Sequence, residues 1–404
     1  MERGDSMLFI VNGTIYPMAE SLPERIEHGC VAAEDGKVVW VGGGLSYEDV
    51  CAELGREKSR EDTLIDARGG WIMPGLIEAH CHMGITEEKK GMEGDDCNET
   101  VDPITPQLRA IDAINSMDAA FGDAVRAGIT SAMIGPGSAN VVGGQFAFVK
   151  TYGRRIDDLI VLAPAAMKVA FGENPKVNYS GQGKSPSTRM AIASMLREEL
   201  TKAVKYKETK EQGRADFKTD FHYEAWLPVL ERKIPLKAHV HRADDIFTAI
   251  RIAKEFGLKM TLDHCSEGHL IAEEIKACGF PAIVGPDLAS RSKIEVQNMA
   301  FKTAGILHAH GVTVAVTTDH PVSIIASLPL CAGLAVKAGL PFLEGLRALT
   351  INAARICNVD KRVGSLEPGK DADIAVFDAN PMEVFTNTLA TVIDGKVVYQ
   401  SEQK

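Results

Sequence analysis

Between residues 71 and 355 the chain alternates short apolar segments with amphipathic ones, and this alternation constrains the fold more than any other feature. The apolar segments, 70–79, 128–135, 165–171, 234–240, 258–264, 280–285 and 312–319, have the length of buried strands. Between two of them, Ile246, Ile250 and Ala253 share one helical face, and Gly257 follows as a helix end. Roughly seven or eight strand–helix units of this kind predict an α/β fold, a (β/α)8 TIM barrel.

A doubly wound sheet is the alternative arrangement of such units. The sequence has no G-x-G-x-x-G after a first strand, and the segment GQGKS at 181–185 lacks the earlier glycine of a phosphate-binding loop. Residues 172–233 fit neither arrangement, because a Gly/Pro/Ser-rich stretch and two polar helical segments are too long for an ordinary connection. They predict an insertion that serves either as a lid or as an oligomer contact.

Both ends of the chain predict short strands joined by tight turns. Asn12–Gly13, Asp35–Gly36 and Asp394–Gly395 interrupt β-branched segments and are typical hairpin signals. The N-terminal part alone holds too little apolar surface for a good domain. We therefore expect one composite β-sandwich domain built from residues 1–70 and 356–404, beside a barrel of residues 71–355.

Composition excludes several classes of function. The formal net charge is -11 and no long Lys/Arg block occurs, which argues against nucleic acid and anionic membranes as partners. No apolar run approaches the length of a membrane span or a signal-peptide core. Eight cysteines without a C-x-x-C pair argue against a disulfide scaffold. The expectation is a soluble protein of the reducing cytoplasm that acts on a small molecule.

The segment MPGLIEAHCH ends with His80 and His82, which would point to one face of a strand while Cys81 points to the other. Alone, this H-x-H pattern is a weak signal that is more often two hydrogen-bonded core histidines than a metal site. Other predicted strands also end in possible metal ligands, namely His239 and His241, His264, and Asp319. Imidazole and carboxylate groups at the carboxyl ends of barrel strands predict a site for an ion of the Zn²⁺ class.

These motifs, together with TTDHP at 317–321, GSLEPGKDADIAVFD at 364–378 and VIDGKVVY at 392–399, resemble the amidohydrolase superfamily. More narrowly, they resemble the branch that holds imidazolonepropionase and metal-dependent dipeptidases. The resemblance spans nearly the whole chain. It implies a (β/α)8 barrel with a β-sandwich built from both termini.

The resemblance also implies roles for the strand-end residues. His80 and His82 would bind the first metal, His239 and His264 would be the ligands of strands five and six, and Asp319 would bind metal and act as base. His239 is preferred to His241 by its spacing from the following helix. His241 is then expected to orient a ligand or to contact substrate.

Lys168 in the segment AAMKVAF decides the expected number of metals. It resembles the strand-four lysine that is carboxylated by CO₂ and bridges two metals in binuclear members. Free lysine cannot bridge metals, because its ammonium group only donates. Without carboxylation, the expected site is mononuclear and uses His80, His82, His239 and Asp319; the lysine would then hold a substrate carboxylate.

Further residues are candidates for substrate binding, each with a plain structural alternative. Gly144 and Gln145 could offer backbone contacts or form a turn. Arg242 and Arg291 could pair with a substrate carboxylate or form surface ion pairs.

The expected function is hydrolysis of a C–N bond, in a cyclic amide or a peptide-like N-acyl amide, by metal-activated water. Asp319 would accept the proton of the water, and His264 would bind metal or polarise the substrate carbonyl. Deamination of an amino-heterocycle is the alternative chemistry, and a non-catalytic scaffold homologue is the alternative class. A homo-oligomer is compatible with the fold.

Overall fold

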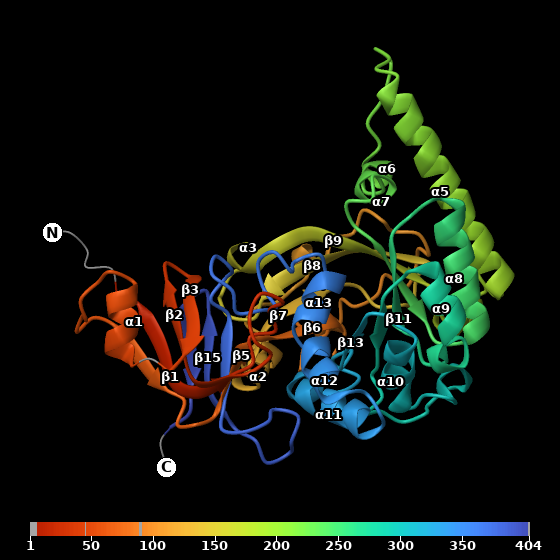
Figure 1. Ribbon diagram of the computed structural model, residues 1–404. Coiled ribbons are helices and arrows are strands. Elements are labelled where there is room, and N and C mark those ends of the chain that lie inside the picture. The colour runs from red at the N-terminus through yellow and green to blue at the C-terminus, as the bar shows by residue number, and fades with distance from the viewer. Residues whose placement is uncertain (1–5, 45, 89–90, 403–404) are drawn as a thin grey trace.

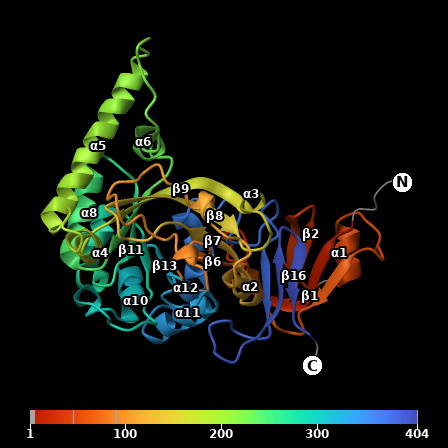
Figure 2. The ribbon, with the colours of Figure 1, turned by 180° about the vertical axis from the view of Figure 1, so that it is seen from behind.

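The computed structural model describes residues 6–44, 46–88 and 91–402 and contains two eight-stranded sheets. Figure 1 shows them side by side, the barrel sheet on the right and the sheet of the two chain ends on the left. Figure 2 gives the same arrangement from behind. The predicted TIM-type barrel with a separate sheet from both termini is confirmed.

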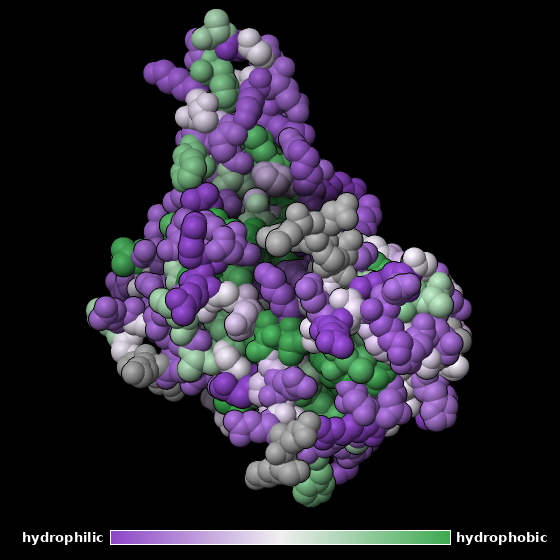
Figure 3. Space-filling view, turned by 90° about the vertical axis from the view of Figure 1, so that its left-hand side faces the viewer, coloured by the Kyte–Doolittle hydropathy of each residue, from purple (hydrophilic) through white to green (hydrophobic). Residues whose placement is uncertain are grey.

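The terminal sheet has the strand order β16-β15-β14-β5-β1-β2-β3, with β4 also paired to β1. Its strands are β1 (Leu8–Ile15), β2 (Ile26–Glu34), β3 (Lys37–Gly43), β4 (Thr63–Asp66), β5 (Trp71–Pro74), β14 (Ile374–Phe377), β15 (Thr388–Ile393) and β16 (Lys396–Gln400). Ile10, Val31, Ile374 and Val392 belong to one apolar cluster, so both ends of the chain share a core. Figure 3 shows the molecule from the side of the terminal sheet. Polar residues cover most of this surface, with hydrophobic patches, in green, between them.

The strand β5 connects the two sheets. It pairs with β1 and with β14, so Trp71–Pro74 lies in the terminal sheet. We propose that the composite domain extends to Pro74 rather than ending at residue 70.

One predicted turn is wrong. Asn12–Gly13 lies inside β1, where Asn12 has φ +57° and the pairing with β2 shifts register. At this irregularity β1 changes its parallel neighbour, from β4 at Leu8–Val11 to β5 at Thr14–Ile15. Asp35–Gly36 and Asp394–Gly395 do form the tight turns expected of them, with positive φ at all four residues.

The barrel strands follow one another in chain order. They are β6 (Leu76–Cys81), β7 (Ile129–Ile134), β8 (Val142–Lys150), β9 (Ile160–Ala170), β10 (Leu236–Val240), β11 (Met260–His264), β12 (Ala282–Val284) and β13 (Val314–Val316). β8 runs antiparallel to both β7 and β9, whereas the other neighbours are parallel. The connection 135–141 contains no helix, so this part of the barrel is a meander rather than regular strand–helix units.

The strands β6 and β13 are the two ends of the barrel sheet. The Glu78 side chain of β6 connects them, because it contacts the segment directly after β13. Its carboxylate accepts hydrogen bonds from the Thr317 hydroxyl at 2.5 Å and the Thr318 backbone N–H at 2.9 Å. The His82 N–H also donates to the His320 carbonyl at 2.8 Å. These bonds hold the ends of β6 and β13 together, and the site lies directly beyond them.

Helices cover the outside of the barrel (Figure 1). The helices of the chain are α1 (Tyr47–Glu53), α2 (Ala119–Arg126), α3 (Ile156–Leu159), α4 (Glu173–Ser180), α5 (Arg189–Glu211), α6 (Phe221–Glu224), α7 (Leu227–Leu230), α8 (Ala243–Glu255), α9 (Ala272–Cys278), α10 (Lys302–Ala309), α11 (Leu328–Lys337), α12 (Phe342–Ala348) and α13 (Ile351–Ile356). Among the described residues, no helix is both long and apolar enough to cross a membrane.

The insertion 172–233 contains one long helix, α5, rather than two comparable ones. The second predicted helix is replaced by the one-turn helices α6 and α7. α5 packs on α8 through its buried side and extends beyond the barrel at the top of Figure 1. Arg189 at its start pairs with the buried carboxylate of Asp245 at 2.9 Å.

Candidate metal centre

Ionisable side chains gather where the barrel strands end. They come from five strands or the segments directly after them: His80 in β6, Lys168 in β9, His239 in β10, His264 in β11, and Asp319 after β13. All five are buried. The carboxyl ends of parallel strands meet at one end of a barrel, which explains why residues so distant in sequence lie together.

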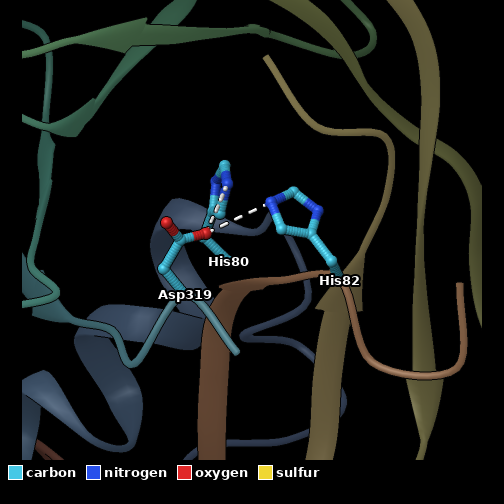
Figure 4. Close-up of side chains that lie close together, drawn as sticks. All are labelled: His80, His82 and Asp319. Atoms are coloured by element: carbon cyan, nitrogen blue, oxygen red, sulfur yellow. Dashed lines mark ion pairs between the residues drawn. The ribbon is translucent and has the colours of Figure 1, made fainter. Parts of the chain in front are cut away.

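His80, His82 and Asp319 form what we term the first cluster. One possible ligand atom from each lies within 4.8 Å of the others. The Oδ1 atom of Asp319 lies 3.6 Å from Nε2 of His80 and 3.2 Å from Nε2 of His82 (Figure 4). This oxygen is buried and has no hydrogen-bond partner. A buried carboxylate oxygen in this situation is costly unless a cation compensates its charge, so the cluster fits a metal ion.

Hydrogen bonds orient both imidazoles of the first cluster. Nδ1 of His80 lies 2.7 Å from Oδ2 of Asp263, and Nδ1 of His82 lies 2.7 Å from the Gly135 carbonyl oxygen. Each ring therefore donates through Nδ1 and directs its Nε2 atom toward Asp319, which is the orientation of metal-binding histidines.

Protonation at this cluster is coupled to cation binding. Burial opposes a charge on His82, but Cys97 and Asp319 outweigh it and raise the pKa of His82 to about 10. For Asp319, burial is outweighed by His264 and His82, which lower the pKa of the carboxyl group. Since a metal requires neutral imidazole, cation binding would displace a proton from His82.

Two of these residues have unusual backbone conformations. His264 has φ +71° and Asp319 has φ +51°, in the left-handed region that residues other than glycine rarely adopt. Such conformations persist where the surrounding structure imposes them, and they are common at functional sites. Here they turn the chain at the ends of β11 and β13, so that both side chains face the barrel mouth.

Lys168 lies against the first cluster. Its Nζ atom is 3.1 Å from Nε2 of His80 and 5.5 Å from the centre of the Phe146 ring. Burial lowers the pKa of Lys168 to about 8, and the nearby ammonium group of Lys237 contributes. A neutral amine is therefore accessible at this position.

His239, His241 and Glu295 form a second cluster, again with possible ligand atoms within 4.8 Å of one another. Nε2 of His239 lies 3.9 Å and Nε2 of His241 lies 3.8 Å from Oε1 of Glu295. Both histidines of the H-x-H pair at the end of β10 therefore face the same carboxylate. The preference for His239 over His241 as the metal ligand stays a prediction.

His264 lies between the two clusters. Its ring centre is 5.0 Å from that of His80, 4.5 Å from that of His239 and 5.0 Å from that of His241. Nδ1 of His264 lies 2.9 Å from the Gly285 carbonyl oxygen. Burial lowers the pKa of His80, His239 and His264 well below that of a free imidazole, so these rings are neutral, as metal ligation requires.

The residues predicted to bind substrate make other contacts in the structure. Gly144 has φ +124°, and a Cβ there would lie 2.6 Å from the Leu108 carbonyl oxygen, so close packing explains this glycine. Gln145 donates to the Pro106 carbonyl oxygen at 3.2 Å. Arg242 forms a bidentate pair with Asp244, and Arg291 donates to the Met299 carbonyl oxygen. None of these contacts involves either cluster.

Four residues near the clusters were not identified as candidates from the sequence: Glu78, Lys237, Asp263 and Glu295. The first three carried a signal, since each is a charged residue inside an apolar strand and had to find a buried partner. Glu295 carried none, because it lies eleven residues after β12, in the short 3-10 helix Ile294–Val296 of a connection between strands.

Sequence comparison defines the class of protein. The amidohydrolase family profile matches residues 71–398, which is most of the chain. The chain therefore belongs to the amidohydrolase family, and the resemblance inferred from the motifs is confirmed.

Three similar proteins illustrate this membership. The crystal structure of an amidohydrolase from Thermotoga maritima MSB8 is 36% identical, has a TM-score of 0.90, and matches over 98% of this chain and 100% of that one. Amidohydrolase tasK of Hapsidospora irregularis is 29% identical over 83% of this chain, which spans only 37% of tasK. Imidazolonepropionase of Maricaulis maris (strain MCS10) is 24% identical over 89% of both chains.

Proposed function

We propose that the protein is a metal-dependent hydrolase that cleaves a C–N bond of a small molecule, either a cyclic amide or a peptide-like N-acyl amide. The observation that carries this proposal is the buried Oδ1 atom of Asp319, which faces the Nε2 atoms of His80 and His82 without a hydrogen-bond partner. Family membership and the similarity to an imidazolonepropionase support the choice of bond.

Zinc is the proposed metal. Two imidazole nitrogens and a carboxylate oxygen are a donor set of catalytic zinc sites, so His80, His82 and Asp319 would hold the ion. A zinc ion bound there would supply Lewis acidity and lower the pKa of water toward about 7.

Asp319 and His264 are the proposed catalytic residues. The lowered pKa of Asp319 keeps it ionised at neutral pH, as a general base requires. It would take the proton of the attacking water and deliver it to the leaving nitrogen. His264, beside both clusters, is positioned to polarise the substrate carbonyl.

Carboxylation of Lys168 is proposed as a modification of this site. The neutral amine would form an N–C bond to CO₂ and release one proton, leaving carbamate oxygens beside His80. Burial, which lowers the pKa of Lys168 to about 8, supports this step. A ¹³C NMR carbamate signal after incubation with ¹³C-bicarbonate should appear in the wild type and be absent from Lys168→Met.

The cytoplasm is the proposed location. The eight cysteines are free thiols, which suits a reducing compartment. Self-association is also proposed, with the extended helix α5 as a surface available for it; sedimentation equilibrium would give the subunit number.

Asp319→Asn tests the function. Turnover of the best substrate from a panel of N-acyl amino acids, dipeptides, cyclic amides and amino-heterocycles should fall by at least about 10²-fold, because the general base and one zinc ligand are lost together. The circular dichroism spectrum should not change. Near-normal turnover by this variant would contradict the proposal, and turnover of amino-heterocycles alone would redirect it to deamination.

A further inference from the structure

We infer that the second cluster, His239, His241 and Glu295, holds a second divalent cation, and that this cation does not require a carbamate on Lys168. The two imidazole Nε2 atoms lie 3.9 and 3.8 Å from Oε1 of Glu295. Ligands on a tetrahedral zinc ion at about 2.0–2.1 Å are roughly 3.4 Å apart. Each imidazole nitrogen would therefore have to approach Oε1 of Glu295 by about 0.4–0.5 Å to reach the spacing of zinc ligands.

In the second cluster, hydrogen bonds engage the second polar atom of His241 and of Glu295. Nδ1 of His241 lies 2.8 Å from the Ser266 hydroxyl, and Oε2 of Glu295 accepts a hydrogen bond from the Glu173 N–H at 2.8 Å. Nε2 of His241 and Oε1 of Glu295 thus remain for a ligand. Orientation of each metal ligand through its second polar atom is the usual arrangement around protein metal sites.

Gly172 makes room for the Glu295 carboxylate. A Cβ at Gly172 would lie 2.6 Å from Oε2 of Glu295, and the residue has φ +87°. The backbone turn at the start of the insertion therefore fixes this carboxylate against the two histidines.

A positive charge already occupies the position next to the free carboxylate oxygen. Nζ of Lys293 lies 2.5 Å from Oε1 of Glu295, although this oxygen has no partner in hydrogen-bond geometry. The same ammonium group donates to Oδ1 of Asn174 at 2.7 Å. A buried carboxylate requires a compensating cation, and a divalent ion with two imidazole ligands would compensate it better than one ammonium group.

Lys293 can leave this position. Its side chain is 24% exposed, whereas that of Glu295 is 2% exposed. The ammonium group can turn to water while keeping its stem in place. We therefore expect Lys293 to compete with the cation for Glu295.

The two clusters are separate sites at one barrel mouth, since His264 lies between them. The inference extends the proposed function from one cation to two, and its catalytic meaning rests on that function.

Zinc binding to the metal-free full-length protein tests the inference directly. The protein is stripped with a chelator, titrated with zinc alone, and analysed for metal content after gel filtration. The wild type should bind two equivalents, and Glu295→Gln and His241→Asn should each bind one. Lys168→Met, which cannot form a carbamate, should still bind two. Lys293→Met should bind the second equivalent at least 10-fold more tightly.

Two further variants separate this inference from the proposed function. Asp319→Asn should lose the equivalent bound by the first cluster and keep the second. Glu344→Gln is the matched control, because the Glu344 carboxylate contacts Arg347 and neither cluster. This variant should bind two equivalents. Thermal melts confirm that each variant is folded. If Glu295→Gln does not fold, the tighter second equivalent expected of Lys293→Met still tests the inference.

Several outcomes would overturn the inference. One equivalent in the wild type, or two in both Glu295→Gln and His241→Asn, would contradict it while leaving the proposed function intact. Loss of one equivalent in Lys168→Met would assign the second cation to a carbamate instead. No bound zinc in the wild type would contradict both proposals.

Discussion

At the scale of single residues, Asp263 determines how His80 faces the first cluster. Its Oδ2 atom lies 2.7 Å from Nδ1 of His80 and 3.0 Å from Nζ of Lys237, and its Oδ1 atom accepts from the Thr261 hydroxyl at 2.7 Å. The carboxylate cannot turn without breaking one of these contacts. The His80 ring is therefore fixed by a residue that never touches the metal position.

Asp263→Asn should weaken zinc binding at the first cluster by about 10- to 100-fold, because loss of an orienting carboxylate lowers the basicity and order of a ligand. Competition with a chromophoric chelator measures the dissociation constant. Thr261→Val is the matched control, since it removes only one bond to Asp263 and should change affinity far less. Equal affinities for Asp263→Asn and the wild type would show that His80 needs no such support.

Some residues of the candidate site could be predicted from the sequence, and others could not. The H-x-H pattern and the ligand-type residues at later strand ends could be identified, because periodicity places them on one face of a buried strand. Glu295 could not, because only the path of the connection between β12 and β13 brings it to His239 and His241. Only the folded chain brings these three together.

At the scale of elements, the irregularity in β1 allows one strand to pair with two others. Gly13 lies where the strand passes the Ile72 and Ala67 side chains, and a Cβ there would be 2.7 Å and 2.9 Å from their atoms. The sequence Asn12–Gly13 predicted a hairpin because its local preference for positive φ is the same in a turn and in a bulge. A bulge forms instead of a turn because β1 pairs first with β4 and then with β5, which its own sequence does not reveal.

Gly13→Ala should lower the free energy of unfolding by about 1–3 kcal/mol, because the added methyl group overpacks the terminal sheet. Urea unfolding followed by circular dichroism measures the change. Gly122→Ala is the control: Gly122 lies inside α2, its Cβ would approach only the end of the Arg126 side chain at 3.4 Å, and the substitution should stabilise by about 0.5–1 kcal/mol. An unchanged stability of Gly13→Ala would mean that β1 relaxes freely at this point.

The antiparallel strand β8 is the other departure at this scale. The barrel class followed from the alternation of apolar and amphipathic segments, which fixes strand number better than strand direction. Direction depends on the connections, and the short segment 135–141 leaves no room for the helix that a parallel strand would need.

At the scale of the whole molecule, a charged network joins the barrel to the terminal sheet. Lys150, at the end of β8, pairs with Asp371 at 2.9 Å and with Asp373 at 2.6 Å. Asp371 also binds Lys37 of β3 at 2.6 Å and Arg362 at 2.8 Å. Burial opposes ionisation of Asp371, but these cations outweigh it and lower its pKa to about 2.

This network should make stability depend on pH. Because the pKa of Asp371 is lower in the folded state than its ordinary value of 3.8, its contribution is fully present above pH 3.8 and is lost as the pH falls toward 2. The contribution is about 2 kcal/mol. The unfolding free energies of the wild type and Asp371→Asn should therefore differ at pH 6 and converge as the pH falls from 3.8 toward 2.

Asp112→Asn is the control, because Asp112 forms an exposed pair with Arg109. Its effect should be below about 1 kcal/mol at either pH. A constant difference between the wild type and Asp371→Asn across this pH range would contradict the role assigned to the network.

The central claim is that His80, His82 and Asp319 hold a catalytic metal ion. Anomalous scattering at the zinc edge from crystals of the zinc-loaded protein tests it most directly. We expect a peak about 2.0–2.2 Å from Nε2 of His80, from Nε2 of His82 and from a carboxylate oxygen of Asp319. Zinc-loaded, catalytically active crystals without a peak between these three residues would contradict it.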